Sequence, residues 1–198
     1  MKGTNMNDIL NTAPRQLLAG LRMLVVLTVI LGAAYPLAVW GIGQVAFSNA
    51  ANGSQIERDG QVVGSKLLAQ KFDGPQWFHA RPSASDYDTT ATGGSNLGPN
   101  SEKLVKQIEE RRAAVAAEDG VAPSQVPADA VTASFSGLDR YISVAYARQQ
   151  VARVAKARGM SVEKLNALVD EHTDGRQLGY LGVGGVNVVT LNLDLSSK

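Results

Sequence analysis

The sequence contains no cysteine and only two histidines, His79 and His172, among its 198 residues. Without cysteine the chain has no disulfides, thiolate zinc sites, iron–sulfur clusters or cysteine nucleophiles. Two histidines do not make a multi-histidine metal site, so the sequence predicts no bound metal. An oxidising compartment is allowed by this composition but not required.

Neither positive nor negative charge predominates in the sequence. The chain has 19 basic and 18 acidic residues, a net charge of +1, and therefore no global field that would gather nucleic acid. Arg148, Arg153, Lys156 and Arg158 form a local basic face, which we expect to be solvated. Hydrophobic residues make up 44% of the chain, which excludes a disordered protein.

The hydrophobic excess is concentrated near the N-terminus. No charged residue occurs between Arg22 and Glu57, a run of 34 positions. Its most apolar part, residues 23–47, would form a helix of about 37 Å, enough to cross a hydrocarbon core of about 30 Å. A single segment in lipid must satisfy its own backbone polar groups. The sequence therefore predicts one transmembrane helix.

The flanks of this helix predict its orientation. Residues 1–22 contain three basic residues and one acidic residue. Because basic residues are retained on the cytoplasmic side, we expect residues 1–22 in the cytoplasm and residues 49–198 outside the membrane. In a cell with two membranes, this places the anchor in the inner membrane and the C-terminal domain in the periplasm.

A cleaved signal peptide is the competing interpretation of the apolar run. Ser48, Asn49 and Ala50 resemble a small-residue cleavage site. However, the apolar region of a signal peptide usually spans about 7–15 residues, and this run is much longer. Cleavage would give a secreted binding protein instead of an anchored one, and the mass of the mature chain distinguishes the two.

Small residues recur within the predicted span, among them Gly32, Ala34, Ala38 and Gly41. Small side chains let a second helix approach closely, so these four residues are candidates for packing against a membrane partner. The alternative is that glycine and alanine are simply common in membrane helices. Pro36 lacks a backbone donor and is expected to kink the helix near Gly32.

The span contains no ionisable residue that could carry an ion or a proton. One helix also cannot enclose a pore. If the protein serves transport, the path for the transported species must belong to a partner.

Residues 49–198 are expected to form a single α+β domain. Asp59–Gly60 is a strong signal for a two-residue hairpin turn, and Ser143 and Ser161 are expected to cap helices. The expected elements are a hairpin over 54–65, an extension of its sheet over 64–72, a long loop over 81–100, helices over 102–118, 143–159 and 161–172, and a half-buried strand over 186–195.

Two loops contain the residue types most suited to contacting a ligand or a partner. Glycines that precede a helix can present backbone N–H groups to an anion, although no phosphate-binding loop motif is present. Charged residues in loops can pair with each other or form a polar patch facing a partner. The candidates are Arg81, Asp86, Gly93, Gly94, Ser95 and Asn96 in the first loop, and Ser136, Gly137 and Asp139 in the second.

An anchored hydrolase outside the cytoplasm is the alternative function. It would use Ser95 or Ser136 as nucleophile with one of the two histidines as base. No G-x-S-x-G motif is present, and His172 falls late in a predicted helix, where a surface position is expected. No residue is therefore assigned a catalytic role.

Six strings, read in order, resemble one family. They are GSKLLAQKF (64–72), WFHARPSASDY (77–87), GGSNLGPNSEKL (93–104), VTASFSGLDRYIS (131–143), QVARVAKARG (150–159) and VNVVTLNLDL (186–195). Together they resemble the C subunit of the Kdp potassium-transporting P-type ATPase of bacteria. The chain departs from the family pattern at Phe135, Arg140, Val144 and residues 183–184.

The resemblance implies an accessory, non-catalytic subunit that is needed for assembly and activity of a high-affinity, ATP-driven potassium uptake complex. It implies two kinds of partner besides the lipid bilayer: a potassium-translocating subunit, which handles the potassium, and an ATP-hydrolysing subunit. It also implies that this chain raises the ATP affinity of the hydrolysing subunit. If ATP is contacted directly, residues 93–98 and 136–139 are the candidates.

Overall fold

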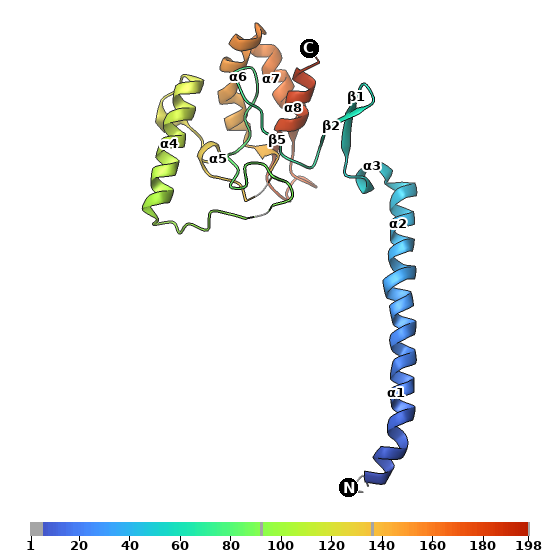
Figure 1. Ribbon diagram of the computed structural model, residues 1–198. Coiled ribbons are helices and arrows are strands. Elements are labelled where there is room, and N and C mark those ends of the chain that lie inside the picture. The colour runs from blue at the N-terminus through green and yellow to red at the C-terminus, as the bar shows by residue number, and fades with distance from the viewer. Residues whose placement is uncertain (1–5, 92, 136, 198) are drawn as a thin grey trace. The chain divides into compact units, whose positions relative to one another are not determined.

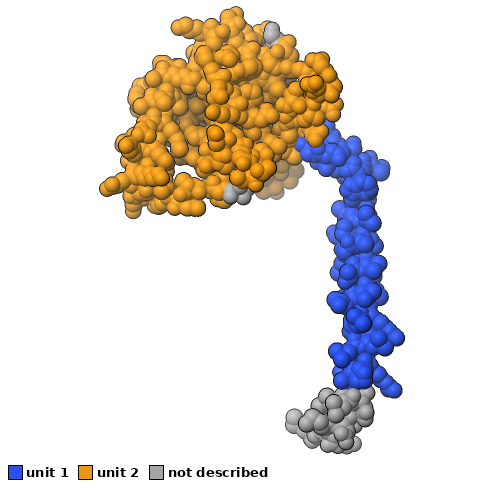
Figure 2. Space-filling view, viewed as in Figure 1, with its two compact units in different colours: residues 1–53 blue, residues 54–198 orange. Residues whose placement is uncertain are grey.

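The computed structural model describes residues 6–91, 93–135 and 137–197. The chain divides into two compact units, residues 1–53 and residues 54–198, which Figure 2 distinguishes by colour. The first unit is helical, and the second unit, called the body below, combines helices with two small sheets.

The first unit contains one long helix built from α1 (Met6–Val29), a π-helical turn η1 (Ile30–Ala34) and α2 (Tyr35–Ala46), followed by the short α3 (Ser48–Ala51). Its residues 12–46 are long and apolar enough to cross a membrane, and none of the most apolar window is buried against the rest of the chain. The predicted helix is confirmed, and its large apolar side chains have no partner within the described chain.

The π-helical turn lies where Pro36 was expected to disturb the helix. Proline has no N–H, so the carbonyl of Gly32 cannot receive the usual bond from the residue four positions later. The neighbouring Tyr35 N–H instead donates to the carbonyl of Ile30, five positions back. The helix continues through this turn without interruption (Figure 1).

The body begins with a hairpin of β1 (Gln55–Arg58) and β2 (Gln61–Ser65), as predicted. Asp59 and Gly60 both have positive φ, which suits the two-residue turns that connect twisted strands. The expected extension of this sheet through residue 72 is wrong. After Ser65 the chain turns, and residues 69–73 have no regular secondary structure. The Ala69 N–H bonds the carbonyl of Gly137 in another loop instead of a strand.

Helices and a second sheet form the rest of the body (Figure 1). The remaining elements are α4 (Glu102–Asp119), η2 (Pro123–Gln125), α5 (Ala128–Val131), β3 (Tyr141–Ile142), α6 (Val144–Arg158), α7 (Val162–Glu171), β4 (Thr173–Asp174), β5 (Gly185–Asn187) and α8 (Val188–Leu195). The second sheet is antiparallel, in the order β3-β5-β4.

The predicted helix starts and stops are confirmed where local signals specify them. The Ser143 hydroxyl accepts the Tyr146 N–H at the start of α6, and Ser161 accepts the Lys164 N–H at the start of α7. Gly159 ends α6 in the left-handed conformation, which glycine adopts without steric cost.

The prediction of a strand over residues 186–195 is wrong beyond Asn187. The Asn187 side chain accepts the N–H groups of Val189 and Thr190 and so caps a helix, α8. The buried positions then follow helical spacing, with Val188, Leu191 and Leu195 fully buried. The alternating sequence is compatible with both a strand and a helix. The Asn187 cap and packing against the core favour the helix.

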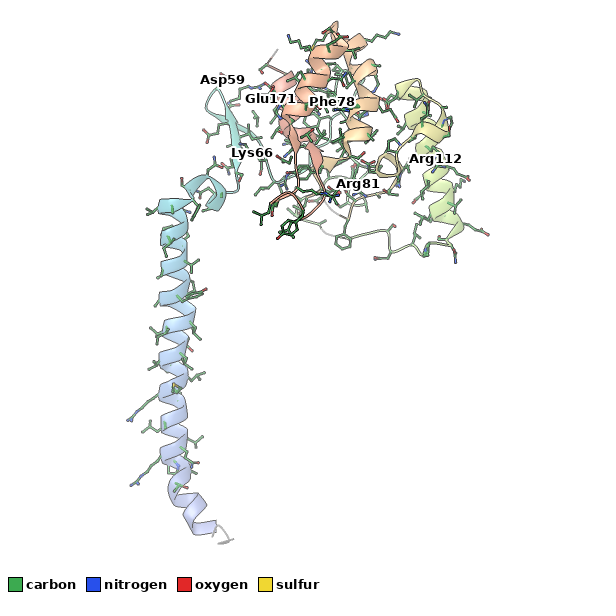
Figure 3. The ribbon with its side chains drawn as sticks, turned by 180° about the vertical axis from the view of Figure 1, so that it is seen from behind. Asp59, Lys66, Phe78, Arg81, Arg112 and Glu171 are labelled. Carbon is green, nitrogen blue, oxygen red and sulfur yellow. The ribbon has the colours of Figure 1, made fainter. Side chains whose placement is uncertain are left out.

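Phe78 lies at the centre of the hydrophobic core and is fully buried, as Figure 3 shows. The backbone beside it has no strand partner. Instead, the Asn192 side chain bonds both the N–H and the carbonyl of Phe78, at 2.9 and 2.8 Å. Gln150 does the same for His79, at 2.7 and 3.1 Å. Two buried amides thus fix the segment that leads into the long loop starting at Arg81.

Candidate functional site

The long loop and the loop that follows α5 lie side by side. Ser134 bridges to Ser83 in parallel, and its N–H bonds the carbonyl of Pro82. Farther along, the N–H of Gly93 bonds the carbonyl of Phe135 at 3.1 Å. We call this region, residues 81–97 with residues 134–139, the loop junction.

Two glycines of the loop junction allow its segments to approach closely. A Cβ at Gly137 would lie 2.6 Å from the carbonyl oxygen of Tyr87, a distance that no side chain tolerates. A Cβ at Gly94 would lie 3.1 Å from the ring of Phe135. The N–H of Ala69 also bonds the Gly137 carbonyl at 2.7 Å. Both glycines therefore allow two segments of this one chain to pack closely against each other.

Arg81 and Asp139 form the ionic contact of the loop junction. The Nη1 atom of Arg81 lies 2.7 Å from Oδ2 of Asp139, and both side chains are about one-third exposed or less. Arg81 Nη2 also donates to the carbonyl of Thr132. The expected pairing of these loop charges is thus observed for Arg81, which spans the two loops.

Tyr87 is a hydrogen-bonding residue of the loop junction whose pKa is affected by nearby acidic residues. Its hydroxyl donates to the Arg81 carbonyl at 2.7 Å. Burial raises the pKa of Tyr87 to about 12, with a further contribution from the negative charges of Asp86 and Asp73. Asp86 itself is exposed and has a positive φ. The phenol therefore remains neutral and acts as a hydrogen-bond donor within the loop.

The structure brings some predicted residues together and leaves others apart. Arg81, Gly93, Gly94, Gly137 and Asp139 meet at the loop junction. Ser95 and Asn96 are exposed on the following turn of the chain. Ser136 lies outside the described residues.

The loop junction does not fit a nucleoside triphosphate. Residues 82–100 contain no lysine or arginine to balance phosphate charge, and they contribute Asp86 and Asp88. The guanidinium of Arg81 is already bonded to Asp139. A Cβ at Gly94 or Gly137 would meet other parts of the chain, so at these two positions the backbone is covered and does not form an open cradle.

The described residues contain no cluster of three histidines, cysteines or carboxylates that would hold a metal ion. Both histidines have structural partners. His79 contacts the carbonyl of Gly74 and the carboxylate of Glu118. His172, which was expected at the surface, is half-buried between Thr190 and Asp194, because α8 packs against the end of α7 where a strand was expected.

A polar groove of about 600 Å³ opens between the hairpin and the second sheet, and sequence reasoning missed it. Its charged lining includes Arg58, Lys66 and Arg140 together with Glu171 and Asp174. Asp194 also lines the groove, which gives three basic and three acidic residues, so the groove favours neither anions nor cations. Its residues come from β1, β3, β4, β5, α7, α8 and the segments beside them, so no local sequence pattern predicts it.

The prediction that the basic face of α6 is solvated is also partly wrong. Arg153 is buried, and its Nε lies 2.8 Å from Oδ1 of Asp119. Arg158 stacks on the ring of Trp77 at 4.3 Å and donates to the carbonyl of Gln76. Arg148 remains exposed, in a pair with Asp170. Long side chains on α6 reach the chain on either side of it, and periodicity alone does not reveal this.

The small residues of the long helix fall on two sides of it. Ala34, Ala38 and Gly41 are spaced by four and three residues and share one face. Gly32 precedes Ala34 by two residues, about 200° around the helix at about 100° per residue, and lies on the other side. Among the described residues, no atom lies within 4 Å of a Cβ built at Gly41, and only a methyl group of Thr28 lies within 4 Å of one built at Gly32.

Comparison with known proteins identifies relatives over nearly the whole chain. The family model described as KdpC, K+-transporting ATPase, c chain, matches residues 17–197. A protein called potassium-transporting ATPase KdpC subunit in Kineococcus radiotolerans is 56% identical over 185 residues, which cover 92% of this chain and 94% of that protein.

Proteins with the same name in other bacteria are also similar to this chain over nearly its whole length. The one from Mycobacterium tuberculosis is 51% identical over 184 residues, covering 91% of this chain and 97% of its own length. The one from Rhodospirillum rubrum is 50% identical over 186 residues, covering 93% and 96%. The similarity includes the apolar helix as well as the body.

Proposed function

Because the chain belongs to the KdpC family and is thus an accessory subunit of a K+-transporting ATPase, we propose that it acts without catalysis, by holding the transport complex together. The observation that carries this proposal is the match over residues 17–197, which includes an apolar helix without ionisable groups. Such a helix provides an anchor and a packing surface but no path for an ion.

The contacts that both histidines make within the fold agree with a non-catalytic role. His79 is held by Gly74 and Glu118, and His172 by Thr190 and Asp194. Each ring is thus occupied by groups that position it within the fold. The comparisons give no support to the alternative of an anchored hydrolase using Ser95 or Ser136.

The proposed topology is a single pass through the cell's inner membrane. The excess of basic residues before the span supports a cytoplasmic location for residues 1–22. The body then lies outside the cytoplasm, in the periplasm where the cell has one. The long apolar helix fits a single-pass protein of a transport complex.

The proposed partners are a potassium-translocating subunit and an ATP-hydrolysing subunit. The face of Ala34, Ala38 and Gly41 packs against a partner helix, and the body covers the outer mouth of the potassium subunit. Potassium itself is handled by that partner. The loop junction, with Arg81 and Asp139 fixed at its centre, provides a rigid surface for docking.

Any effect of this chain on the ATP affinity of the hydrolysing subunit then follows from assembly and not from a nucleotide site in the loop junction. The packing of Gly94 and Gly137 and the lack of a free basic residue in residues 82–100 support this part of the proposal. Equilibrium dialysis of the full chain with labelled ATP tests it, and the expected result is no saturable binding.

Purification in mild detergent tests the proposed function most simply. The full chain, tagged at its C-terminus, should retain both large subunits of the transporter through the purification. Its deletion should abolish potassium-dependent ATP hydrolysis, and reintroduction of the intact chain should restore it. Recovery of the tagged chain alone, or undiminished ATP hydrolysis without it, would refute the proposal.

A further inference from the structure

The loop between β4 and β5, residues 175–184, carries the most exposed large apolar side chains of the body. Leu178 is 82% exposed, Tyr180 69% and Val183 91%. Leu181, at 47%, adds to the same tip. Residues 177–184 contain no charged group. An exposed apolar cluster of this kind marks an interaction surface.

Part of the backbone of this tip is hydrogen-bonded within the loop. Gln177 and Leu181 exchange two hydrogen bonds of 2.9 Å, and the N–H groups of Gly179 and Tyr180 bond the carbonyls of Arg176 and Gln177. Because lipid tails offer no hydrogen bonds, backbone groups that are already paired in this way can move toward the acyl chains at a lower cost.

Leu178 occupies a turn position that does not suit it. Its φ is +54°, followed by +83° at Gly179, and the Tyr180 N–H bonds back to the Gln177 carbonyl. Asparagine, aspartate or glycine is preferred at such a position. The leucine is therefore strained and gains little packing in return, so the fold itself does not account for it.

The base of this loop and the first residue of the body border one groove. Asp174, the last residue of β4, lines the same groove as Ser54, the first residue of the body. Ser54 follows the end of the long helix at Ala46 by eight residues, at most about 28 Å of extended chain. A bilayer that holds the helix is thus always within reach of the body.

We propose that the tip of this loop, Leu178 with Tyr180, Leu181 and Val183, inserts into the interfacial region of the bilayer on the body's side of the membrane. Tyrosine is favoured at the level of the lipid headgroups, and the aliphatic side chains enter the boundary of the acyl chains. The contact gives the body a second attachment to the membrane and restricts its rotation about the tether.

The absence of cysteine from the sequence allows a clean test. The full chain carrying Val183→Cys is labelled with the environment-sensitive dye NBD and reconstituted into vesicles of phosphatidylcholine and phosphatidylglycerol. Each vesicle holds on average less than one chain, which excludes contacts between copies. The matched control is Gln61→Cys, an exposed site at the other hairpin of the body.

We expect blue-shifted emission at residue 183 and quenching by lipids that carry a shallow nitroxide, at least about twofold greater than at residue 61. Adding Leu178→Asn, which relieves the turn, together with Tyr180→Ser should reduce this quenching to the control level while the circular dichroism spectrum stays unchanged. Equal quenching at residues 183 and 61 would overturn the proposal. Shielding of residue 183 that arises only after the other transporter subunits are added would also overturn it, by identifying a protein as the occupant.

Discussion

Arg153 and Asp119 form an ion pair that water hardly reaches, with side chains 5% and 2% exposed. Arg153 also donates to the carbonyls of Pro75 and Trp77. Arg153→Ala removes the cationic partner of the buried Asp119 carboxylate, which keeps only a neutral hydrogen bond from Gln149, and the donor to two carbonyls. We expect the free energy of unfolding to fall by about 3–5 kcal/mol, measured by denaturant titration of the full chain in detergent.

The matched control for this substitution lies on the same helix. Arg148 pairs with Asp170 at 3.0 Å, but both side chains are more than half exposed. Such pairs contribute about 0–1 kcal/mol, so Arg148→Ala should shift the unfolding midpoint only slightly. Similar losses for the two variants would contradict the structural role assigned to Arg153.

Tyr87 makes the stability of the body sensitive to alkaline pH. Its pKa is raised from 10.0 to about 12, first by burial and then by Asp86 and Asp73. Below pH 10 the phenol is neutral in both the folded and the unfolded chain, and its contribution is complete. As the pH rises from 10 through about 12, the unfolded chain loses this proton first, and the contribution is lost.

Tyr87→Phe therefore has two expected effects. Near neutral pH it removes the bond to the Arg81 carbonyl and costs about 1 kcal/mol. Above pH 10 the free energy of unfolding should decline less steeply than in the native chain, because one shifted group is gone. Unfolding titrations over that range provide the measurement, and parallel pH curves for the two proteins would show that Tyr87 does not contribute.

At the scale of elements, Gly41 tests the proposed packing face of the long helix. A Cβ added at this position has no described atom within 4 Å. Gly41→Leu should therefore leave the isolated chain intact and weaken its association with partner helices by about 1–2 kcal/mol, roughly tenfold. The amount of each large subunit that co-purifies with the tagged chain is the readout.

Gly32→Leu is the companion variant on the other side of the helix. If Ala34, Ala38 and Gly41 form the packing face, Gly32→Leu should change co-purification less than Gly41→Leu does. Undiminished recovery of the partners with Gly41→Leu would count against the proposed face.

Elements with strong local signals were predictable from the sequence. The Asp59–Gly60 turn and the Ser143 and Ser161 caps each depend on neighbours within a few residues. α8 was not predictable in this way, since alternating Leu and polar residues fit a strand equally well. Its helix depends on the Asn187 cap and on burial of Leu191 and Leu195 against distant parts of the chain.

At the scale of the whole molecule, the sequence indicates which loops matter but not how they meet. Arg81 pairs with a carboxylate 58 positions later, and Gly93 bonds the carbonyl of Phe135. The amides of Gln150 and Asn192 bind a backbone segment that lies 71 and 114 positions away. Such contacts arise from the packed core, and spacing within one segment does not encode them. The family resemblance, by contrast, was readable from six ordered strings and is confirmed by the comparisons.

The central claim is that an apolar helix tethers a body that lies outside the cytoplasm. Single cysteines in this cysteine-free chain, treated in intact cells with a membrane-impermeant maleimide, test it directly. Arg112, which points away from α4 in Figure 3, reports on the body, and Gln16 reports on the opposite end of the helix. The account predicts that Arg112→Cys is labelled in intact cells and Gln16→Cys only after lysis. The reverse pattern would contradict it.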